Sequence, residues 1–172
     1  METDKLSQIV SEACGEVLEK MMFLEAWQKE PYTARDFVLE KELVGGIAFQ
    51  GEFNGRIIVN CSRRLAEAAT LGLLGVEPDA LLEEQVKDTV KEMANMICGS
   101  VFSKIDSVNS LVKLGIPSCV DLKIETFPFK AEKEIMVFPF SCGSITPDSE
   151  EEEVFLLEIS IDSQPDSSRQ NQ

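Results

Sequence analysis

The order in which two hydrophobic periodicities follow one another constrains the fold of this chain more than any other feature. Apolar residues recur every three to four positions in a helix that covers a core, and at every second position in a strand. Along the chain, one helical segment is followed by three strand-like stretches, two helical segments and three more strand-like stretches. Strand groups that alternate with helices predict an α+β domain, with helices packed on a largely antiparallel sheet.

Three segments carry the helical pattern. They are expected over residues 5–27, 62–74 and 79–105. Ser62 can cap the second helix, and Gly75 is placed to end it. The buried face of the third and longest helix is expected to consist of Leu82, Val86, Val90, Met93, Ile97 and Val101.

Strand character is found in six stretches, which predict a six-stranded sheet. The Asn54-Gly55 step between the second and the third favours a tight hairpin turn. The acidic run at 150–153 is expected to form a solvated loop, and the polar residues 163–172 a disordered tail. No linker interrupts the pattern before that tail, so we expect a single domain over residues 1–162. The six predicted strands are residues 37–43, 46–50, 56–60, 120–124, 135–138 and 154–161.

Composition excludes several classes of function. The 172 residues contain no histidine, which removes histidine-based zinc sites and the Ser-His and Cys-His nucleophile systems. Five cysteines without a CxxC spacing indicate neither a disulfide framework nor a zinc site, so we expect small buried hydrophobes. A formal net charge of −15 argues against binding to nucleic acid or anionic membranes. Without a long apolar run or a signal-peptide pattern, the chain is expected to be cytoplasmic.

Four unusual residues share one strip of the third predicted helix. At about 100° per residue, Asp88, Glu92, Asn95 and Gly99 lie roughly 100° to 160° from Met93, on one side. In a helix interior, Asn costs several tenths of a kcal/mol and Gly about 1 kcal/mol relative to Ala. The strip is either a solvated face with low-propensity residues or a docking surface that presents a carboxylate, a carboxamide and a bare patch. Periodicity leaves both interpretations open.

The spacing of these residues resembles the signature of a known family. Asp88-x3-Glu92-x2-Asn95-x21-Pro117 is similar to the pattern of the CheC and CheX chemotaxis phosphatases. The segment Glu92-Met-Ala-Asn95-Met-Ile-Cys-Gly99 looks like the same family. The resemblance covers nearly the whole chain in its order of elements, and it implies the CheC-like fold.

A second, weaker copy of the pattern lies in the first predicted helix, 76 residues upstream. Glu12, Glu16 and Glu19 stand at the corresponding positions, and Phe23 replaces Gly99. Glu19 carries a negative charge at the position where Asn95 has a neutral amide, and the Phe23 side chain would block the close approach of a partner. We therefore interpret this copy as degenerate. The resemblance implies two such sites in CheC-type proteins, whereas CheX-type proteins keep only the site on the later helix. This chain is similar to the CheX type.

The resemblance implies a hydrolase that acts on the phosphoaspartate of a CheY-like response regulator. Asn95 would orient the attacking water, and Glu92 would pair with a lysine of the receiver domain. Asp88 and Gly99 would take part in partner binding. Asp88 would contact the partner, and Gly99 would leave room for it because it has no side chain. Mg²⁺ is expected in the receiver and none in this chain, because its carboxylates at 88 and 92 form no convergent oxygen cage. Pro117 is expected to start a strand.

The same resemblance implies a homodimer joined along sheet edges. Two other readings stay open at this point. The chain could be a non-catalytic adaptor similar to CheC-like domains of the flagellar switch, or a phosphatase in a pathway other than motility. Dephosphorylation of a receiver, measured with and without the protein, separates the adaptor from the enzyme.

Overall fold

The computed structural model describes residues 3–51, 53–105, 112–131, 133–145, 148 and 150–162. The predicted tail, residues 163–172, lies outside these ranges. The described helices are α1 (Thr3–Met22), α2 (Arg63–Leu74), the short 3₁₀ helix η1 (Pro78–Ala80) and α3 (Glu83–Ser103). The described strands are β1 (Trp27–Gln28), β2 (Tyr32–Ala34), β3 (Leu43–Gln50), β4 (Gly55–Cys61), β5 (Lys113–Leu114), β6 (Ser118–Asp121), β7 (Ile135–Ser141) and β8 (Val154–Ile161).

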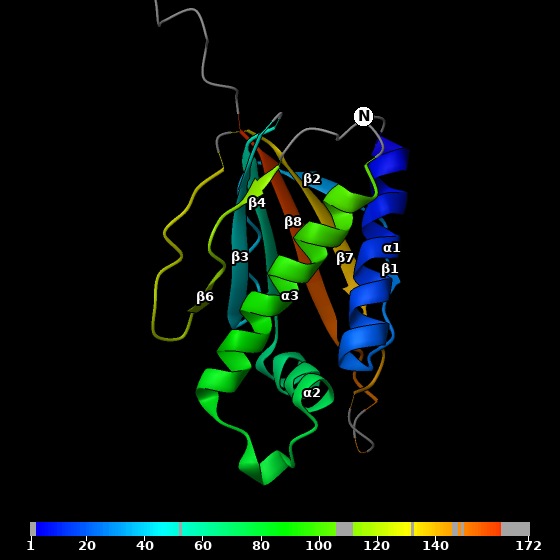
Figure 1. Ribbon diagram of the computed structural model, residues 1–172, viewed down its shortest axis with the longest axis vertical. Coiled ribbons are helices and arrows are strands. Elements are labelled where there is room, and N and C mark those ends of the chain that lie inside the picture. Colours follow the sequence, from blue (N-terminus) through cyan, green and yellow to red (C-terminus); the bar gives the residue numbers. More distant parts are fainter. Residues whose placement is uncertain are drawn as a thin grey trace, which may run out of the picture.

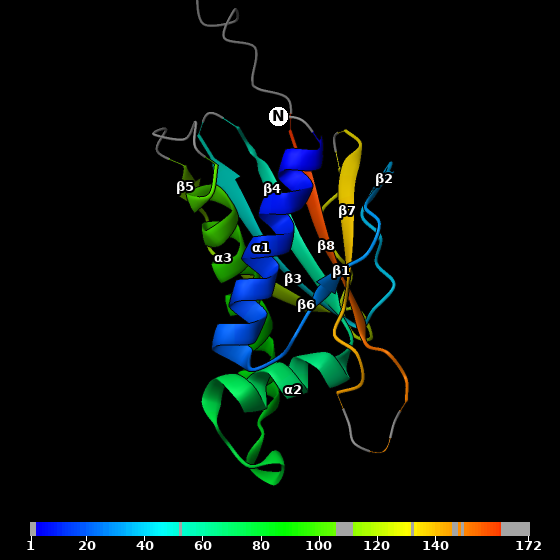
Figure 2. The same cartoon turned by 90° about the vertical axis from the view of Figure 1, so that its right-hand side faces the viewer.

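The helices cover one face of a single sheet (Figure 1). The strand order is β1-β7-β8-β4-β3-β5, with β2 also paired to β7 and β6 to β3. Every described pair is antiparallel. α1 and α3 cross the sheet in opposite directions, and α2 lies under one end of α1 (Figures 1 and 2). The predicted α+β fold with a mainly antiparallel sheet is confirmed.

The main core lies between the helices and the sheet. Alternate residues of β4 show the two faces, since Ile57 and Val59 belong to this core and Ile58 to a cluster on the opposite face. α3 lies directly against β3 where Gly45 stands. A Cβ at that position would lie 2.6 Å from the carbonyl oxygen of Val90, so any side chain there would push α3 away from the sheet. Gly45 thus sets the depth at which α3 is seated.

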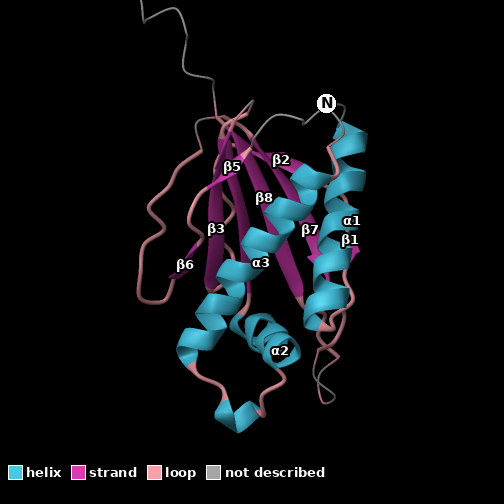
Figure 3. Cartoon of the chain, in the orientation of Figure 1, coloured by secondary structure: helices cyan, strands magenta, loops and turns pink. Residues whose placement is uncertain are grey.

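The described sheet has eight strands rather than the predicted six. Figure 3 draws strands in magenta. β1, β2 and β5 have two or three residues each, too few to show a period-two pattern. β3 begins at Leu43, earlier than predicted, and β4 follows it in the hairpin predicted from Asn54-Gly55. β6 ends at Asp121 rather than residue 124, because the Asp121 side chain accepts the N–H of Lys123 at 3.0 Å and turns the chain.

The prediction of a strand over residues 37–43 is wrong. Residues 37–42 have no strand partner and run across the face of the sheet opposite the helices, where Phe37 packs on the smaller clusters. Their backbone is held by the buried side chain of Asn60 instead. Its Oδ1 accepts the N–H groups of Glu40 and Lys41 at 2.9 and 3.0 Å, and its Nδ2 donates to the Lys41 carbonyl at 3.1 Å. Side chains of neighbouring strands therefore satisfy backbone groups that a sheet ladder would otherwise pair.

The first helix ends at Met22 rather than residue 27. Phe23 adopts the left-handed conformation with φ 56°, and the N–H of Leu24 donates to the carbonyl of Leu18 at 2.9 Å. This hydrogen bond satisfies a carbonyl group of the last helical turn, and the left-handed residue at a helix end is usually glycine. The residues that follow are therefore free to pair with β7 as β1.

The second helix has its predicted ends, and the start of the third differs. Ser62 caps α2, because its Oγ accepts the N–H of Leu65 at 3.0 Å, and Gly75 ends it with φ 63°. α3 begins at Glu83 rather than residue 79, since η1 precedes it. The Gln85 side chain then accepts the backbone N–H of Leu82 at 3.0 Å and caps the helix.

Candidate functional site

α3 presents the four predicted site residues on the side that faces away from the sheet. Asp88 is exposed, and Glu92, Asn95 and Gly99 are half-buried. The structure therefore brings these residues together along one helix face, as the angle calculation predicted. The opposite side of α3, packed into the core, consists of Val86, Thr89, Val90, Met93, Ala94, Ile97, Cys98 and Val101.

The side chains of Glu92 and Asn95 are unpaired within the part of the chain that the structure describes. They stand three positions apart on one helix, so they emerge as neighbours. Asp88 differs, because its carboxylate accepts a hydrogen bond from Lys91 at 3.0 Å on the surface. A carboxylate and a carboxamide thus lie side by side on α3, both available to a partner.

Gly99 leaves a bare patch beside Asn95. A Cβ built at position 99 would meet no described atom within 4 Å outside its own helix backbone. Packing within the described chain therefore does not require glycine here, in contrast to Gly45. A helix interior normally disfavours glycine, so the bare surface is consistent with clearance for something outside the chain.

A hollow of about 440 Å³ opens beside the strip. Glu92 and Asp88 supply carboxylates to it, and Asn95 follows one turn further along α3. Sequence reasoning did not identify the leucines in its wall, because they belong to another helix and only tertiary packing places them there. The described lining consists of Leu73 and Leu74 from the end of α2 and Gln85, Asp88, Thr89 and Glu92 from α3.

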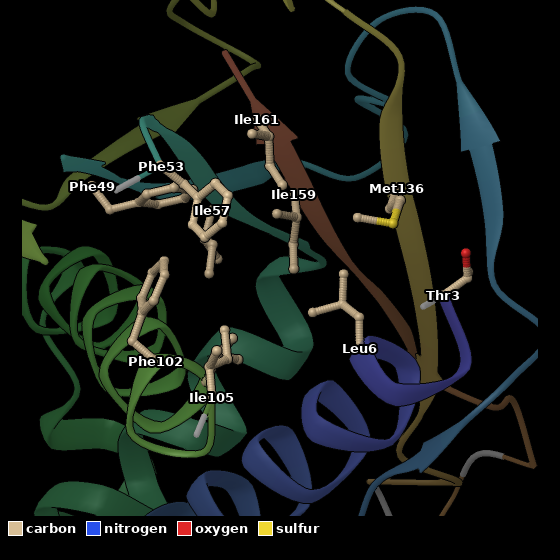
Figure 4. A pocket seen from close by; sticks show the side chains of 11 residues that line it. Thr3, Leu6, Phe49, Phe53, Ile57, Phe102, Ile105, Met136, Ile159 and Ile161 are labelled. Carbon is tan, nitrogen blue, oxygen red and sulfur yellow. The ribbon is translucent and has the colours of Figure 1, made fainter. Parts of the chain in front are cut away.

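A second cavity, of about 140 Å³, lies between α1, α3 and the sheet (Figure 4). Its described lining is apolar apart from Thr3, so it offers no set of groups that could hold a water or bind an anion. The strip on α3, which carries polar side chains, is therefore the stronger candidate for a functional site than this cavity. The described lining consists of Thr3, Leu6, Phe49, Phe53, Ile57, Val101, Phe102, Ile105, Met136, Ile159 and Ile161.

Pro117 comes immediately before β6, as expected for a residue that starts a strand. It is half-buried, whereas the preceding Ile116 is almost fully exposed. β6 pairs with β3, the strand that seats α3. This placement makes Pro117 a structural residue next to the sheet edge.

The acidic strip of α1 is engaged in contacts of its own. Glu16 accepts a hydrogen bond from Lys104 at 3.0 Å, and this charged contact lowers the pKa of Glu16. Glu12 accepts one from Gln8 at 3.1 Å. Phe23, predicted inside the helix at the position matching Gly99, lies just beyond the helix end. The two strips therefore differ in geometry as well as in sequence.

The cysteines are free thiols, four of them buried and Cys119 half-buried. Burial raises the pKa of all five thiol groups, which disfavours the reactive thiolate. Their predicted role as small hydrophobes is confirmed for the buried four. In the described ranges, no group of three or more Cys, Asp or Glu converges as a metal site. None of the described helices has the length and apolar character that spanning a membrane requires.

Solved structures of CheX and CheC-like proteins share this fold. CheX from Vibrio vulnificus is 24% identical with a TM-score of 0.72, covering 91% of this chain and 99% of that one. A CheC-like superfamily protein from Shewanella sp. PV-4 is 21% identical with a TM-score of 0.73, covering 95% and 100%. CheX from Borrelia burgdorferi, solved in a complex with CheY, BeF₃ and Mg²⁺, is 19% identical with a TM-score of 0.69, covering 91% and 97%.

Sequence comparison with families assigns the chain more specifically than its fold does. No curated protein matches it. The family described as "Chemotaxis phosphatase CheX" matches residues 43–141, which is more than half of the chain and includes the whole of α3. The chain therefore belongs to the CheX family of chemotaxis phosphatases.

Proposed function

We propose that this chain hydrolyses the phosphoaspartate of a CheY-like receiver domain. Family membership supports the phosphatase chemistry, and the Borrelia CheX solved with CheY supports a receiver as the substrate. The observation from this chain that carries the proposal is that a carboxylate, Glu92, and a carboxamide, Asn95, stand next to each other. They are neighbours on the outward side of α3, and both are unpaired in the described ranges.

Asn95 orients the attacking water. Its planar carboxamide combines a donor and an acceptor, so it can hold a water molecule in line with the phosphorus–oxygen bond that breaks. Phosphoryl transfer needs such positioning more than it needs covalent help. Because the amide is neutral, it does not repel the anionic phosphoryl group, as a carboxylate at this position would.

Glu92 sets the depth of insertion. Its carboxylate pairs with the receiver lysine that lies next to the phosphoaspartate, and this contact places Asn95, one turn further along, beside the phosphorus. Asp88 contributes to docking from the preceding turn. Gly99 lets the receiver backbone approach the helix without meeting a side chain.

Mg²⁺ belongs to the receiver in this proposal. The ion neutralises charge on the phosphoryl oxygens from the receiver side, and this chain supplies the water-orienting amide and the anchoring carboxylate. A carboxylate from this chain near the metal would compete with the phosphoryl group for it. The roles of the two proteins are therefore complementary.

Two substitutions at position 95 test the proposal. Asn95→Ala removes the amide, and Asn95→Asp keeps its shape but adds a negative charge. Both are expected to abolish stimulated dephosphorylation, measured as loss of phosphoryl groups from a CheY-type receiver. Glu84→Ala, an exposed change in the first turn of the same helix, is the matched control and keeps full activity.

Binding to the receiver activated with beryllofluoride and Mg²⁺ separates chemistry from docking, because Asn95→Ala should bind normally. Near-normal turnover by Asn95→Ala would overturn the proposal. A wild-type chain that binds the receiver without any turnover would be a non-catalytic adaptor instead.

We also propose that the chain forms a homodimer through a sheet edge. β5 and β6 lie at one end of the sheet order and pair on one side with β3. Exposed Leu114 and Ile116 lie along this edge, and an open strand edge readily pairs with another chain. Light scattering should report about 38 kDa, twice the 19.1 kDa of one chain. A mass of one chain at micromolar concentration would remove the dimer and leave the enzymatic proposal intact.

A further inference from the structure

The end of α1 holds an exposed aromatic residue in an unfavourable backbone conformation. Phe23 has φ 56°, and it is 78% exposed. The left-handed region is costly for an L-residue with a bulky side chain, and helices that end this way usually carry glycine. Exposure of the ring yields no compensating burial. Neither feature favours phenylalanine in the folded chain alone, and strained residues of this kind occur at functional sites.

Phe23 lies beside the end of α2. Gly72 packs directly against the carbonyl group of Met22, where a Cβ would find no room. Figures 1 and 2 show the corresponding ends of α1 and α2 side by side. Two residues beyond Gly72, Leu74 is 46% exposed and lines the hollow that also contains Glu92. Leu74 thus adjoins the proposed site on α3, and the end of α1 that carries Phe23 packs against the same last turn of α2.

We propose that Phe23 and Leu74, which we call the apolar rim, form the apolar half of the docking surface for the receiver domain. This inference rests on the proposed function and adds the residues that hold the partner. The occupant is a receiver that presents a lysine to Glu92 and an apolar surface beside that lysine. A few apolar or aromatic anchors next to a charge pair supply most of the binding energy in many protein interfaces.

Phe23→Gly distinguishes a docking role from a structural one, because the two roles predict opposite outcomes. Glycine adopts φ 56° without strain, so the midpoint of urea unfolding should rise. Affinity for the receiver activated with beryllofluoride and Mg²⁺ should fall about tenfold, because the aromatic anchor is lost. If the residue were only structural, the more stable variant would bind at least as well as the wild type.

Leu74→Ala provides an independent second variant. It should weaken the same affinity about fivefold, as expected when a half-exposed leucine becomes buried on binding. In turnover experiments both rim variants should raise KM and leave kcat at saturation unchanged, since neither touches the phosphoryl group.

Ile124→Ala is the matched control. Ile124 is 75% exposed and precedes Glu125, which pairs with Lys87 at 3.4 Å. Lys87 emerges from α3 about 140° around the axis from Glu92, so this control removes an exposed aliphatic side chain on another side of the helix. It should change neither affinity nor turnover.

The outcomes separate the two proposals. If the wild type binds and dephosphorylates the receiver, and both rim variants keep affinities within twofold of it, the apolar rim is refuted and the proposed function stands. If Asn95→Ala keeps its turnover while the rim variants bind weakly, the catalytic assignment fails and the docking surface stands. If the wild-type chain does not bind the activated receiver at all, both proposals are refuted.

Discussion

Glu158 of β8 should make the stability of this chain depend on pH in an unusual direction. The residue is fully buried, and its Oε2 accepts the N–H of Val38 at 2.7 Å. Its Oε1 has no hydrogen-bond partner among the described atoms. Burial raises the pKa of Glu158 from 4.5 to about 8, the hydrogen bond from Val38 opposes this, and the charges of Glu40 and Asp36 add to it. At neutral pH the folded chain therefore holds this carboxyl in its protonated form.

The size of the effect follows from linkage between proton binding and folding. Above pH 4.5 the unfolded chain ionises at Glu158 and the folded chain does not, so stability falls as the pH rises towards 8. Each tenfold change in proton affinity is worth about 1.4 kcal/mol. The resulting destabilisation is about 3 kcal/mol at pH 7 and levels off at about 5 kcal/mol above pH 8, where both states are ionised. Below pH 4.5 the contribution vanishes, because both states are protonated.

Glu158→Gln removes this titration and keeps an oxygen that accepts the Val38 hydrogen bond. We expect the free energy of unfolding to rise by about 1 kcal/mol at pH 5.5, 3 kcal/mol at pH 7 and 5 kcal/mol at pH 9. Urea unfolding followed by far-ultraviolet circular dichroism at these three values measures the change. Glu134→Gln, an exposed change just before β7, removes the same charge without the burial and should show no such trend. A gain that stays constant across this range would refute the reasoning.

Three further predictions concern the site on α3. Gly99→Ala should stabilise the fold by up to about 1 kcal/mol in urea unfolding, since packing leaves room for the methyl group, and it should lower receiver turnover. Glu92→Ala should weaken both receiver affinity and turnover rate by about ten-fold to a hundred-fold, because a charge-assisted contact is lost. Glu16→Ala and Glu19→Ala on α1 should leave turnover nearly unchanged. The reverse pattern would place the functional surface on α1. EDTA should abolish turnover through the receiver and leave the circular dichroism of this chain unchanged, and stoichiometric metal in the purified chain would contradict this.

Local chemistry made several elements predictable. Ser62 and Gly75 mark the ends of α2, and Asn54-Gly55 marks the β3–β4 hairpin, because capping and turn preferences act over a few neighbouring residues. The long apolar period of α3 likewise identified Val86, Val90, Met93, Ile97 and Val101 on its buried face, but Leu82, also predicted there, is the N-cap residue and is 60% exposed. In each case the forces that decide the conformation lie within the segment itself.

Two of the mistaken predictions have a different cause, because a residue from another segment packs against the element or holds its backbone. Residues 37–42 have an acceptable strand pattern, but the side chain of Asn60 binds the backbone N–H groups of Glu40 and Lys41 in place of a neighbouring strand. α1 ends at Met22 although the next residue, Phe23, is not a glycine. The residue that packs against this helix end is Gly72, which comes from α2. No local preference in either segment reports such a partner.

The sequence by itself determined which residues share the strip on α3, because direction around a helix axis follows from residue number alone. It also determined that a neutral amide and a carboxylate emerge as neighbours there. Only the tertiary structure decided what surrounds them. Leu74 reaches the hollow beside Glu92, and Phe23 lies next to the end of α2, because the end of α2 packs against both α3 and the end of α1. Such proximity depends on how distant segments pack, and that information is not contained in any single stretch of the chain.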